Sequence, residues 1–233
     1  MIKHIAIIPD GNRRWANERR VPLNEGHRIG AQTTQKIFEK ALELKIPYLT
    51  FWAASYDNLI KRSKEEVKFL ITLINAEFQK LLDDARVHKN EVKVRILGRF
   101  QEVFPEKTLR IIEKLMKKTE NYEIFSLTFL LAYNGTDEML AAIKRIAKEV
   151  KISTIKITGE LIKSFLWTKD LPPVDLVIRT GCQDDPHNSA GFMMWHTAYS
   201  QYYFTKTLYP DFTSEEFEKA VKDFEKKERR LGK

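Results

Sequence analysis

The chain has little that could cross-link it and no run long enough to cross a membrane. Cys182 is its one cysteine, so an internal disulfide framework is excluded, and a lone thiol suits a reducing compartment. No run approaches the roughly 18 continuous apolar residues of a membrane-spanning helix. The first apolar run begins almost at once, which leaves no room for a secretory signal. We therefore expect a cytoplasmic protein.

Linkers, repeats and nucleotide-binding loops are missing as well. Without a Pro/Gly/Ser-rich linker or an internal repeat, 233 residues with 43% hydrophobic content predict one domain over residues 1–233. There is no Walker loop and no G-x-G-x-x-G, so a nucleotide is not implied. Zinc-finger spacings and RNP motifs are absent, so we expect no nucleic-acid partner. The net charge of +8 still favours an anionic partner, such as a diphosphate or an anionic membrane surface.

What the chain does have is a regular alternation of apolar runs and amphipathic stretches. The expected strands are Ile5–Ile8, Ile46–Ala53, Val92–Leu97, Glu123–Ala132, Val174–Ile178 and Tyr202–Phe204. The expected helices are Gly26–Lys45, Lys64–His88, Glu106–Lys118, Asp137–Val150, Thr158–Phe165 and Ser214–Arg230. This alternation predicts an α/β fold with a central, mostly parallel sheet flanked by helices.

Several polar residues and turns follow the predicted strands directly. They are Asp10, Ser55, Gly98, Tyr133 and Arg179. Ligands of parallel sheets bind at the carboxyl ends of the strands. We therefore expect these positions to converge on one site.

The first of these strand ends carries a phosphate-binding pattern. Asp10-Gly11-Asn12 alone is equally compatible with an ordinary turn. Arg13 and Arg14 follow at once, and arginine binds phosphate oxygens in bidentate fashion. A helix start adds free N–H groups, and an aspartate can hold Mg²⁺ against diphosphate oxygens. The pattern indicates a diphosphate site.

Motifs along nearly the whole chain resemble those of the cis-prenyltransferases, the family of undecaprenyl diphosphate synthase. H-x-A-I-I-x-D-G-N-x-R-W-A, present from His4 to Ala16, is that family's signature. The further blocks that match it are Gly26–Gly30, Ser55–Asn58 with Arg62, Tyr133–Gly135, Asp175–Gly181, Phe192–Tyr199 and Tyr209–Phe212.

The resemblance implies a prenyl transfer in which an allylic diphosphate loses pyrophosphate as a second isoprenoid diphosphate attacks through its double bond. It implies that Mg²⁺ is the cofactor, bound by Asp10, and that Asp10, Asn12 and Asn58 are catalytic. The substrate-binding residues that it implies are Gly11, Asn12, Arg13, Arg14, Trp15, His27, Ser55, Arg62 and Arg179. It also implies an apolar tunnel for the prenyl chain, a homodimer, and a lipid product through which the enzyme could associate peripherally with a membrane.

For some of these residues the sequence leaves simpler readings open. His27 is also compatible with an ordinary polar residue at a helix start. One extra residue precedes Arg62 in its block, so Lys61 could take its place. Phe51, Trp52 and Phe129 suit a core as well as a tunnel wall.

The departures from the family pattern cluster after Arg179. The usual run is R-T-G-G-x-x-R-x-S-N-F-L-L-W, and here it is about three residues longer. Counting back from Phe192 places Asn188 where the second arginine is expected and Ala190 where the serine is expected, with Ser189 adjacent. We expect Asn188 and Ser189 to bind the attacking substrate. The change predicts an altered acceptor: dimethylallyl diphosphate joined in a branched linkage, in place of or beside isopentenyl diphosphate.

Another departure concerns the metal. Gln201 stands where the family has a glutamate linked to Mg²⁺ binding, so the ligand oxygen is kept and its charge is lost. Asp184 and Asp185 could supply a carboxylate, although Asp-Asp-Pro is more simply a turn.

Two broader questions stay open at this level. Some members of the family work as heteromers in which one chain lacks catalytic residues, although here D-G-N is intact. Product length is weakly encoded; Leu127, Phe129, Leu130 and Leu131 could form a floor that favours short products.

Overall fold

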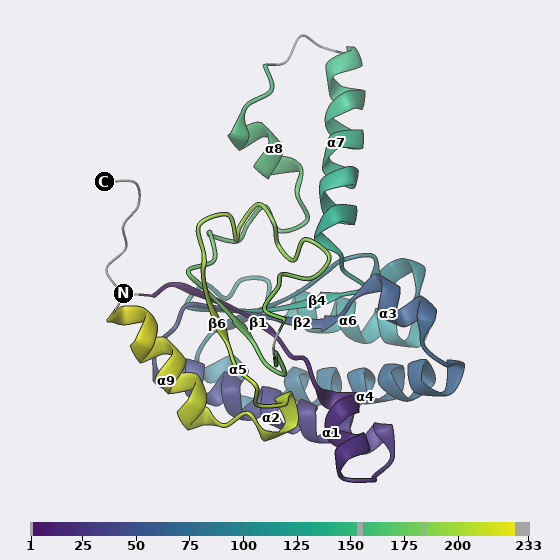
Figure 1. Ribbon diagram of the computed structural model, residues 1–233. Helices are drawn as coiled ribbons and strands as arrows, with labels where there is room; N and C mark the ends of the chain where they lie inside the picture. Colours follow the sequence, from purple (N-terminus) through teal and green to yellow (C-terminus); the bar gives the residue numbers. More distant parts are fainter. Residues whose placement is uncertain (1, 153–155, 184, 227–233) are drawn as a thin grey trace.

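A single parallel sheet forms the centre of the molecule. The computed structural model describes residues 2–152, 156–183 and 185–226 (Figure 1). Its strands in that part of the chain are β1 (His4–Ile8), β2 (Tyr48–Ala54), β3 (Val92–Leu97), β4 (Phe125–Leu131), β5 (Leu176–Arg179) and β6 (Gln201–Phe204). They pair in the order β3-β4-β2-β1-β5-β6, and every pairing is parallel. The predicted α/β class is confirmed.

Helices cover the sheet and connect its strands. They are α1 (Asn12–Glu18), α2 (Leu23–Glu43), α3 (Tyr56–Lys61), α4 (Lys64–Asp83), α5 (Ala85–Lys89), α6 (Glu106–Lys118), α7 (Gly135–Ile152), α8 (Gly159–Phe165) and α9 (Ser214–Glu225), with 3-10 turns at Phe100–Glu102 and Tyr209–Asp211. Helices α2, α4 and α9 lie below the sheet in Figure 1, whereas α7 projects upward from it. In the described residues no helix has the length and apolar character needed to cross a bilayer.

The central strands are buried on both faces, which explains their unbroken apolar runs. In β1, Ile5 and Ile7 belong to the large core cluster that includes residues of α2, α4 and α9, whereas Ala6 and Ile8 belong to the cluster on the opposite face. Strands covered on both sides carry no polar alternation. The sheet can therefore hold functional residues only at the strand ends.

Several predicted element ends were wrong. The helix expected over Lys64–His88 breaks at Asp84, whose carboxylate accepts the Arg86 N–H at 2.8 Å and caps the separate helix α5. Helix α2 begins directly after Pro22, three residues before its predicted start. Helix α3 was not predicted. The terminal helix ends at Glu225, and residues 227–230 of its predicted span lie outside the described residues.

A buried carboxylate fixes the connection between β4 and α7. Glu138 is 2% exposed and accepts the Tyr133 hydroxyl at 2.6 Å. Its other oxygen accepts both the amide and the hydroxyl of Thr168 at 2.8 Å. Burial and the Glu138 charge raise the pKa of Tyr133 well above its usual value. Asn134, which lies between these residues, is thereby held at the edge of the sheet.

Two buried histidines make the stability of the fold dependent on pH. His4 in β1 is fully buried, with Nδ1 2.9 Å from the Pro172 carbonyl and Nε2 2.8 Å from the Thr50 hydroxyl. Burial lowers the pKa of His4 from 6.5 to about 4, and burial likewise lowers the pKa of His196 to about 4. Both side chains are therefore neutral in the folded protein at neutral pH.

We predict that the free energy of unfolding falls as the pH is lowered through the window from 6.5 to about 4. Because the folded-state pKa lies below the unfolded value, the unfolded chain takes up the proton first, so this stability is present above pH 6.5 and is lost below it. For His4 alone the loss amounts to about 3 kcal/mol. Denaturant unfolding across this range checks it. A variant His4→Gln should show a shallower slope, and an unchanged slope would contradict the assignment.

Candidate active site

A polar cavity opens where the carboxyl ends of four strands meet. Asp10 follows β1, Ser55 follows β2, Asn134 follows β4 and Arg179 ends β5. All four line a cavity of about 690 Å³, whose lining includes five cationic side chains and two carboxylates. This excess of positive charge suits anionic ligands. The expected convergence is thus observed for Asp10, Ser55 and Arg179, whereas Gly98 and the fully buried Tyr133 do not line this cavity.

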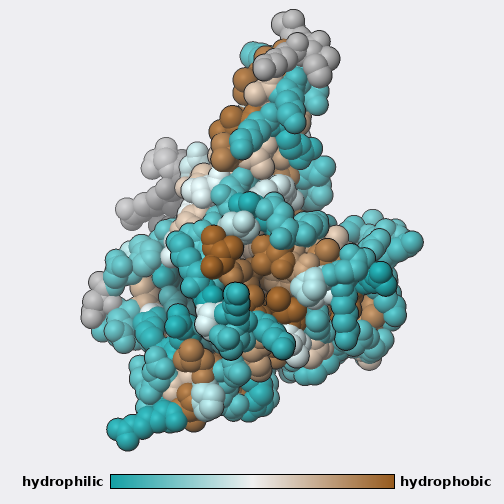
Figure 2. Space-filling view, turned by 90° about the vertical axis from the view of Figure 1, so that its right-hand side faces the viewer, coloured by the Kyte–Doolittle hydropathy of each residue, from teal (hydrophilic) through white to brown (hydrophobic). Residues whose placement is uncertain are grey.

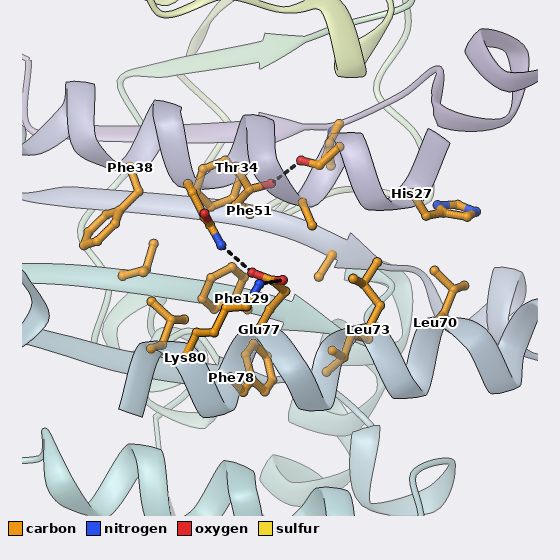
Figure 3. A pocket seen from close by; sticks show the side chains of 18 of the residues that line it. His27, Thr34, Phe38, Phe51, Leu70, Leu73, Glu77, Phe78, Lys80 and Phe129 are labelled. Atoms are coloured by element: carbon orange, nitrogen blue, oxygen red, sulfur yellow. Dashed lines mark hydrogen bonds and ion pairs between the residues drawn. The ribbon is translucent and has the colours of Figure 1, made fainter. Parts of the chain in front are cut away.

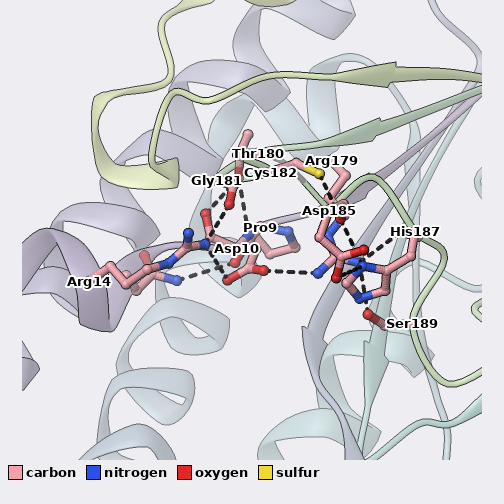
Figure 4. Close-up of polar contacts among 11 residues, drawn as sticks. Pro9, Asp10, Arg14, Arg179, Thr180, Gly181, Cys182, Asp185, His187 and Ser189 are labelled. Atoms are coloured by element: carbon pink, nitrogen blue, oxygen red, sulfur yellow. Dashed lines mark hydrogen bonds and ion pairs between the residues drawn. The ribbon is translucent and has the colours of Figure 1, made fainter.

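The Asp10 carboxylate lies between two guanidinium groups (Figure 4). Its Oδ1 is 3.2 Å from Arg14 Nη2 and its Oδ2 is 3.1 Å from Arg179 Nη2. The backbone is held as well, because the Asp10 amide donates to the Thr180 hydroxyl and that hydroxyl donates back to the Asp10 carbonyl. The side chain remains 39% exposed, so it can still accept a ligand.

Close approach of the β1 and β5 ends depends on glycine. Gly11 has φ +114°, and Gly181 has φ +61°. A Cβ on Gly181 would stand 2.6 Å from Arg14 Nη2 and 2.7 Å from the Asp10 carbonyl oxygen. Because glycine has no Cβ, Arg14 can donate to the Gly181 carbonyl at 2.6 Å. The D-G-N and R-T-G motifs therefore form one structural unit.

Asn12 begins α1 and faces both the cavity and helix α2. Gly30 allows this contact, because a Cβ there would overlap Asn12 Oδ1. That Oδ1 is buried and has no hydrogen-bond partner among the described residues. A buried acceptor without a partner costs free energy unless a ligand or water supplies a donor. Asn12 is therefore poised toward the cavity.

Glu66 organises the cationic side of the cavity, and the sequence reasoning missed it. It is 6% exposed, and its Oε1 lies 3.1 Å from His27 Nε2 and 3.3 Å from Arg62 Nη1. Arg13 Nε is 3.8 Å away. The available signal was a capping box, since the Ser63 hydroxyl accepts the Glu66 amide at 3.2 Å. One buried carboxylate thus positions three basic groups.

This arrangement shows where the residues of two open readings lie. His27 is 7% exposed and lines the cavity, and burial lowers its pKa, with the nearby Arg62 and Arg13 charges adding to the effect. Arg62 is 19% exposed and pairs with Glu66, whereas Lys61 is 73% exposed and pairs with Asp57. Both residues line the cavity, but of the two only Arg62 pairs with the buried Glu66.

Ser55 and Asn58 lie at the start of α3 on the cavity wall. The Ser55 hydroxyl accepts the Asn58 amide at 3.0 Å, which is an N-cap interaction. Its own proton stays available for donation to a ligand.

Arg179 ties the atypical loop to the site. Its Nη1 donates to Ser189 Oγ at 2.8 Å and to the His187 carbonyl at 2.7 Å. Ser189 and Ala190 both line the cavity, but only Ser189 has a hydroxyl there, and it accepts from Arg179. The residue two before this serine is then His187, where the family pattern has arginine. Counting back from Phe192 gives Asn188 and Ala190 for the two family positions, whereas counting from the Arg179–Ser189 contact gives His187 and Ser189.

Three predicted site residues do not line the cavity: Trp15, Asn188 and Gln201. Trp15 packs in a small cluster with Ala16 and Leu208, and its indole N–H donates to Asp211 at 2.8 Å. Asn188 is exposed, and its amide contact is a long one, 3.4 Å to the Phe192 carbonyl.

Gln201 begins β6 and pairs with Leu176, at the amino end of β5. Leu176 pairs with Ile5 of β1, and Asp10 lies beyond Ile8 at the carboxyl end of that strand. At least about 10 Å of strand therefore separates Gln201 from Asp10 along the strand direction within one chain. Asp185 is 88% exposed and pairs with His187, while Asp184 lies outside the described residues. Gln201 therefore shares no ligand position with Asp10 within the chain, and Asp185 does not line the cavity.

The cavity fits a magnesium ion only together with a substrate. No cluster of three or more metal-binding side chains occurs in the described part of the chain. Mg²⁺ is typically held by one or two carboxylates plus substrate phosphates and waters. Asp10, half surrounded by arginines and open to the cavity, fits that arrangement.

An apolar cavity of about 250 Å³ adjoins the polar one (Figure 3). Asn12, His27 and Leu70 line both. Its walls come from α2, α4, β2 and β4 and include Phe38, Phe51, Leu73, Phe78, Leu127 and Phe129. Leu130 faces the opposite side of the sheet, and Leu131 does not line the cavity. The paired cavities can hold a molecule with a charged head and a hydrocarbon tail.

Comparison with known proteins agrees with this geometry. The prenyltransferase family described as undecaprenyl diphosphate synthase matches residues 8–232. The tritrans,polycis-undecaprenyl-diphosphate synthase (geranylgeranyl-diphosphate specific) of Thermoplasma volcanium is 36% identical over 99% of this chain and 88% of its own. The isoprenyl transferase of Thermotoga maritima is 39% identical over 99% and 96%.

A solved structure is also similar. Lavandulyl diphosphate synthase from Lavandula x intermedia, in complex with dimethylallyl diphosphate, superposes with a TM-score of 0.90 and 26% identity over 100% of this chain and 98% of that one. The charged cavity with its apolar neighbour, and the motifs that build it, therefore belong to a prenyl-transferring enzyme that condenses prenyl diphosphates: this chain is a member of the undecaprenyl diphosphate synthase family.

Proposed function

We propose that the polar cavity binds two isoprenoid diphosphates and that the apolar cavity holds the chain of the allylic one. The observation that carries this proposal is that Asn12, His27 and Leu70 line both cavities, so a headgroup and its tail fit in one continuous site. The allylic diphosphate lies on the amides after Asp10, with Arg13 and Arg14. The acceptor diphosphate lies beside Arg179 and Ser189.

In the reaction the bond between the allylic carbon and the diphosphate oxygen breaks, and the acceptor double bond forms the new carbon–carbon bond. The acceptor then loses a proton to the released pyrophosphate or to water. Negative charge grows on the leaving group, and preorganised guanidinium groups stabilise it. Bound Mg²⁺ would act as a Lewis acid on the same oxygens. Ser55 and Asn58 are placed to donate hydrogen bonds near the leaving group.

We further propose that the acceptor is dimethylallyl diphosphate, giving a branched linkage. The support is the long loop 182–191, in which His187 replaces an arginine and Arg179 is already engaged by Asp10 and Ser189. The relative with a TM-score of 0.90 is named for lavandulyl diphosphate and was solved with dimethylallyl diphosphate. Head-to-tail addition of isopentenyl diphosphate with cis geometry is the alternative, favoured by the names of the undecaprenyl relatives.

A partner-dependent subunit is the other functional class. Asp10, Arg14 and Arg179 are intact and assembled within one chain, which favours a chain that is active without a different partner. Turnover by the purified chain alone tests this point.

We predict that Asp10→Asn lowers kcat about 100- to 1,000-fold, because it removes the carboxylate that holds the metal and aligns two arginines. Pyrophosphate release as a function of Mg²⁺ concentration measures it. Asp83→Asn, at an exposed position on α4, is the matched control and should behave as wild type. Equal Mg²⁺ dependence in Asp10→Asn and wild type would contradict the assignment.

The acceptor is tested by product structure. Wild-type protein is supplied with dimethylallyl diphosphate alone, or with an allylic primer and isopentenyl diphosphate, and products are identified by mass spectrometry and NMR. We expect a branched product from dimethylallyl diphosphate alone. Restoring the family arginine with His187→Arg should shift turnover toward isopentenyl diphosphate. Linear products only, in wild type, would rule out the branched linkage.

We also propose a homodimer formed through the projecting helix α7. Leu140, Ile143 and Val150 recur on one face of α7 and are 51%, 54% and 41% exposed. Figure 2 shows apolar side chains running along this projecting part of the molecule. Of the predicted Tyr199–Tyr209 region, Tyr199 is 84% exposed whereas Tyr209 is buried. An exposed apolar stripe of this kind marks an interaction surface.

Sedimentation analysis should find wild type as a dimer and Leu140→Asp/Ile143→Asp as a folded monomer. Lys148→Asp, on another face of α7, is the control and should remain dimeric. Monomeric wild-type protein at micromolar concentration would overturn the dimer.

A further inference from the structure

The apolar cavity has a polar element across it. Gln35 Nε2 on α2 donates to Glu77 Oε2 on α4 at 2.5 Å, and Lys80 Nζ donates to Glu77 Oε1 at 2.7 Å. Figure 3 shows this bridge spanning the gap between the two helices, farther from His27 than Leu70 and Leu73 are. Most of the remaining wall around it is aromatic or aliphatic.

Contact between this polar bridge and a hydrocarbon chain is energetically unfavourable. The Glu77 side chain is only 21% exposed, and both of its oxygens are engaged. A chain that grew past it would have to displace these contacts or bury the carboxylate against methyl groups, and either change is unfavourable. The lining just beyond the end of α4 is also charged, because Asp84 and Arg86 form an ion pair at 2.6 Å there.

The size of the cavity agrees with an early stop. An apolar cavity of about 150 Å³ binds benzene, so a cavity of 250 Å³ holds roughly ten carbons by proportion. That is two isoprene units, far fewer than an undecaprenyl chain contains.

We infer that the Gln35–Glu77 bridge is a chain-length stop, which limits the prenyl chain that this site accommodates to a few isoprene units. The inference rests on the proposed function, because it assigns the apolar cavity to the prenyl chain. The residues that determine specificity are then Gln35 and Glu77, in addition to the aromatic walls.

The test compares allylic primers of ten and twenty carbons. In Gln35→Leu/Glu77→Leu hydrocarbon side chains replace the polar bridge, so kcat/KM for the longer primer relative to the shorter should rise about tenfold or more. Mass spectrometry should show longer products. Gln79→Leu, on the exposed side of α4, is the matched control and should leave the ratio unchanged. Gln35→Met serves as a second variant if the double variant does not fold.

Failure of this inference can be told from failure of the proposed function. If wild type turns over short primers and the folded variants keep the wild-type ratio, the stop is wrong and the function stands. If wild type turns over no pair of diphosphates, the proposed function is wrong. In that case, dissociation constants of unreactive thiodiphosphates of increasing length decide the stop: affinity should level off with length in wild type and continue to rise in the double variant, and parallel curves would contradict it.

Discussion

The site depends on one interaction, in which the Asp10 carboxylate is held between the guanidinium groups of Arg14 and Arg179. It joins the turn after β1 to the end of β5, and the hydrogen bonds of Thr180 and the close contact at Gly181 maintain it. With two carboxylates among five cationic side chains, and Asp10 directly beside two guanidinium groups, the cavity favours a ligand that brings both negative charge and a divalent cation. Both parts of a metal–diphosphate complex meet this requirement.

The second organising constraint is the buried Glu66. A carboxylate that is 6% exposed is stable there only because His27 and Arg62 pair with it. In return Glu66 holds both side chains on the wall of the polar cavity, and His27 also lines the apolar cavity. A headgroup bound by Asp10, Arg13 and Arg14 can therefore place its tail against Leu70 and the aromatic walls.

Much of this was predictable from local patterns. Each strand is an apolar run that ends in a polar or glycine turn. The motifs D-G-N-x-R-W and D-L-V-I-R-T-G each follow or end such a strand. Because the strands are parallel, the two motifs were expected to meet at the same edge of the sheet. Features that depend on packing were not predictable. Trp15 turns away because Leu208 covers it, and Gln201 falls at the other edge because of the register of β6.

In the loop over residues 182–191, the sequence predicted the contacts of single residues only in part. Of the two residues expected to bind the attacking substrate, Ser189 lines the cavity and accepts a hydrogen bond from Arg179, which also donates to the His187 carbonyl, whereas Asn188 does not line the cavity. The backbone turns directly after Ser189, at Ala190 and Gly191, which both have positive φ. Gln35 and Glu77 lie on helices that are far apart in the sequence, so no local pattern indicated that their side chains would meet.

The most direct measurement is a crystal structure of the protein with an unreactive prenyl thiodiphosphate and Mn²⁺ in place of Mg²⁺, located by its anomalous signal. The account predicts the metal on Asp10, the diphosphate on the amides and guanidinium groups of residues 11–14, and the hydrocarbon between α2 and α4. A headgroup bound elsewhere, with the Asp10 contacts to Arg14 and Arg179 unchanged and no metal beside them, would contradict it.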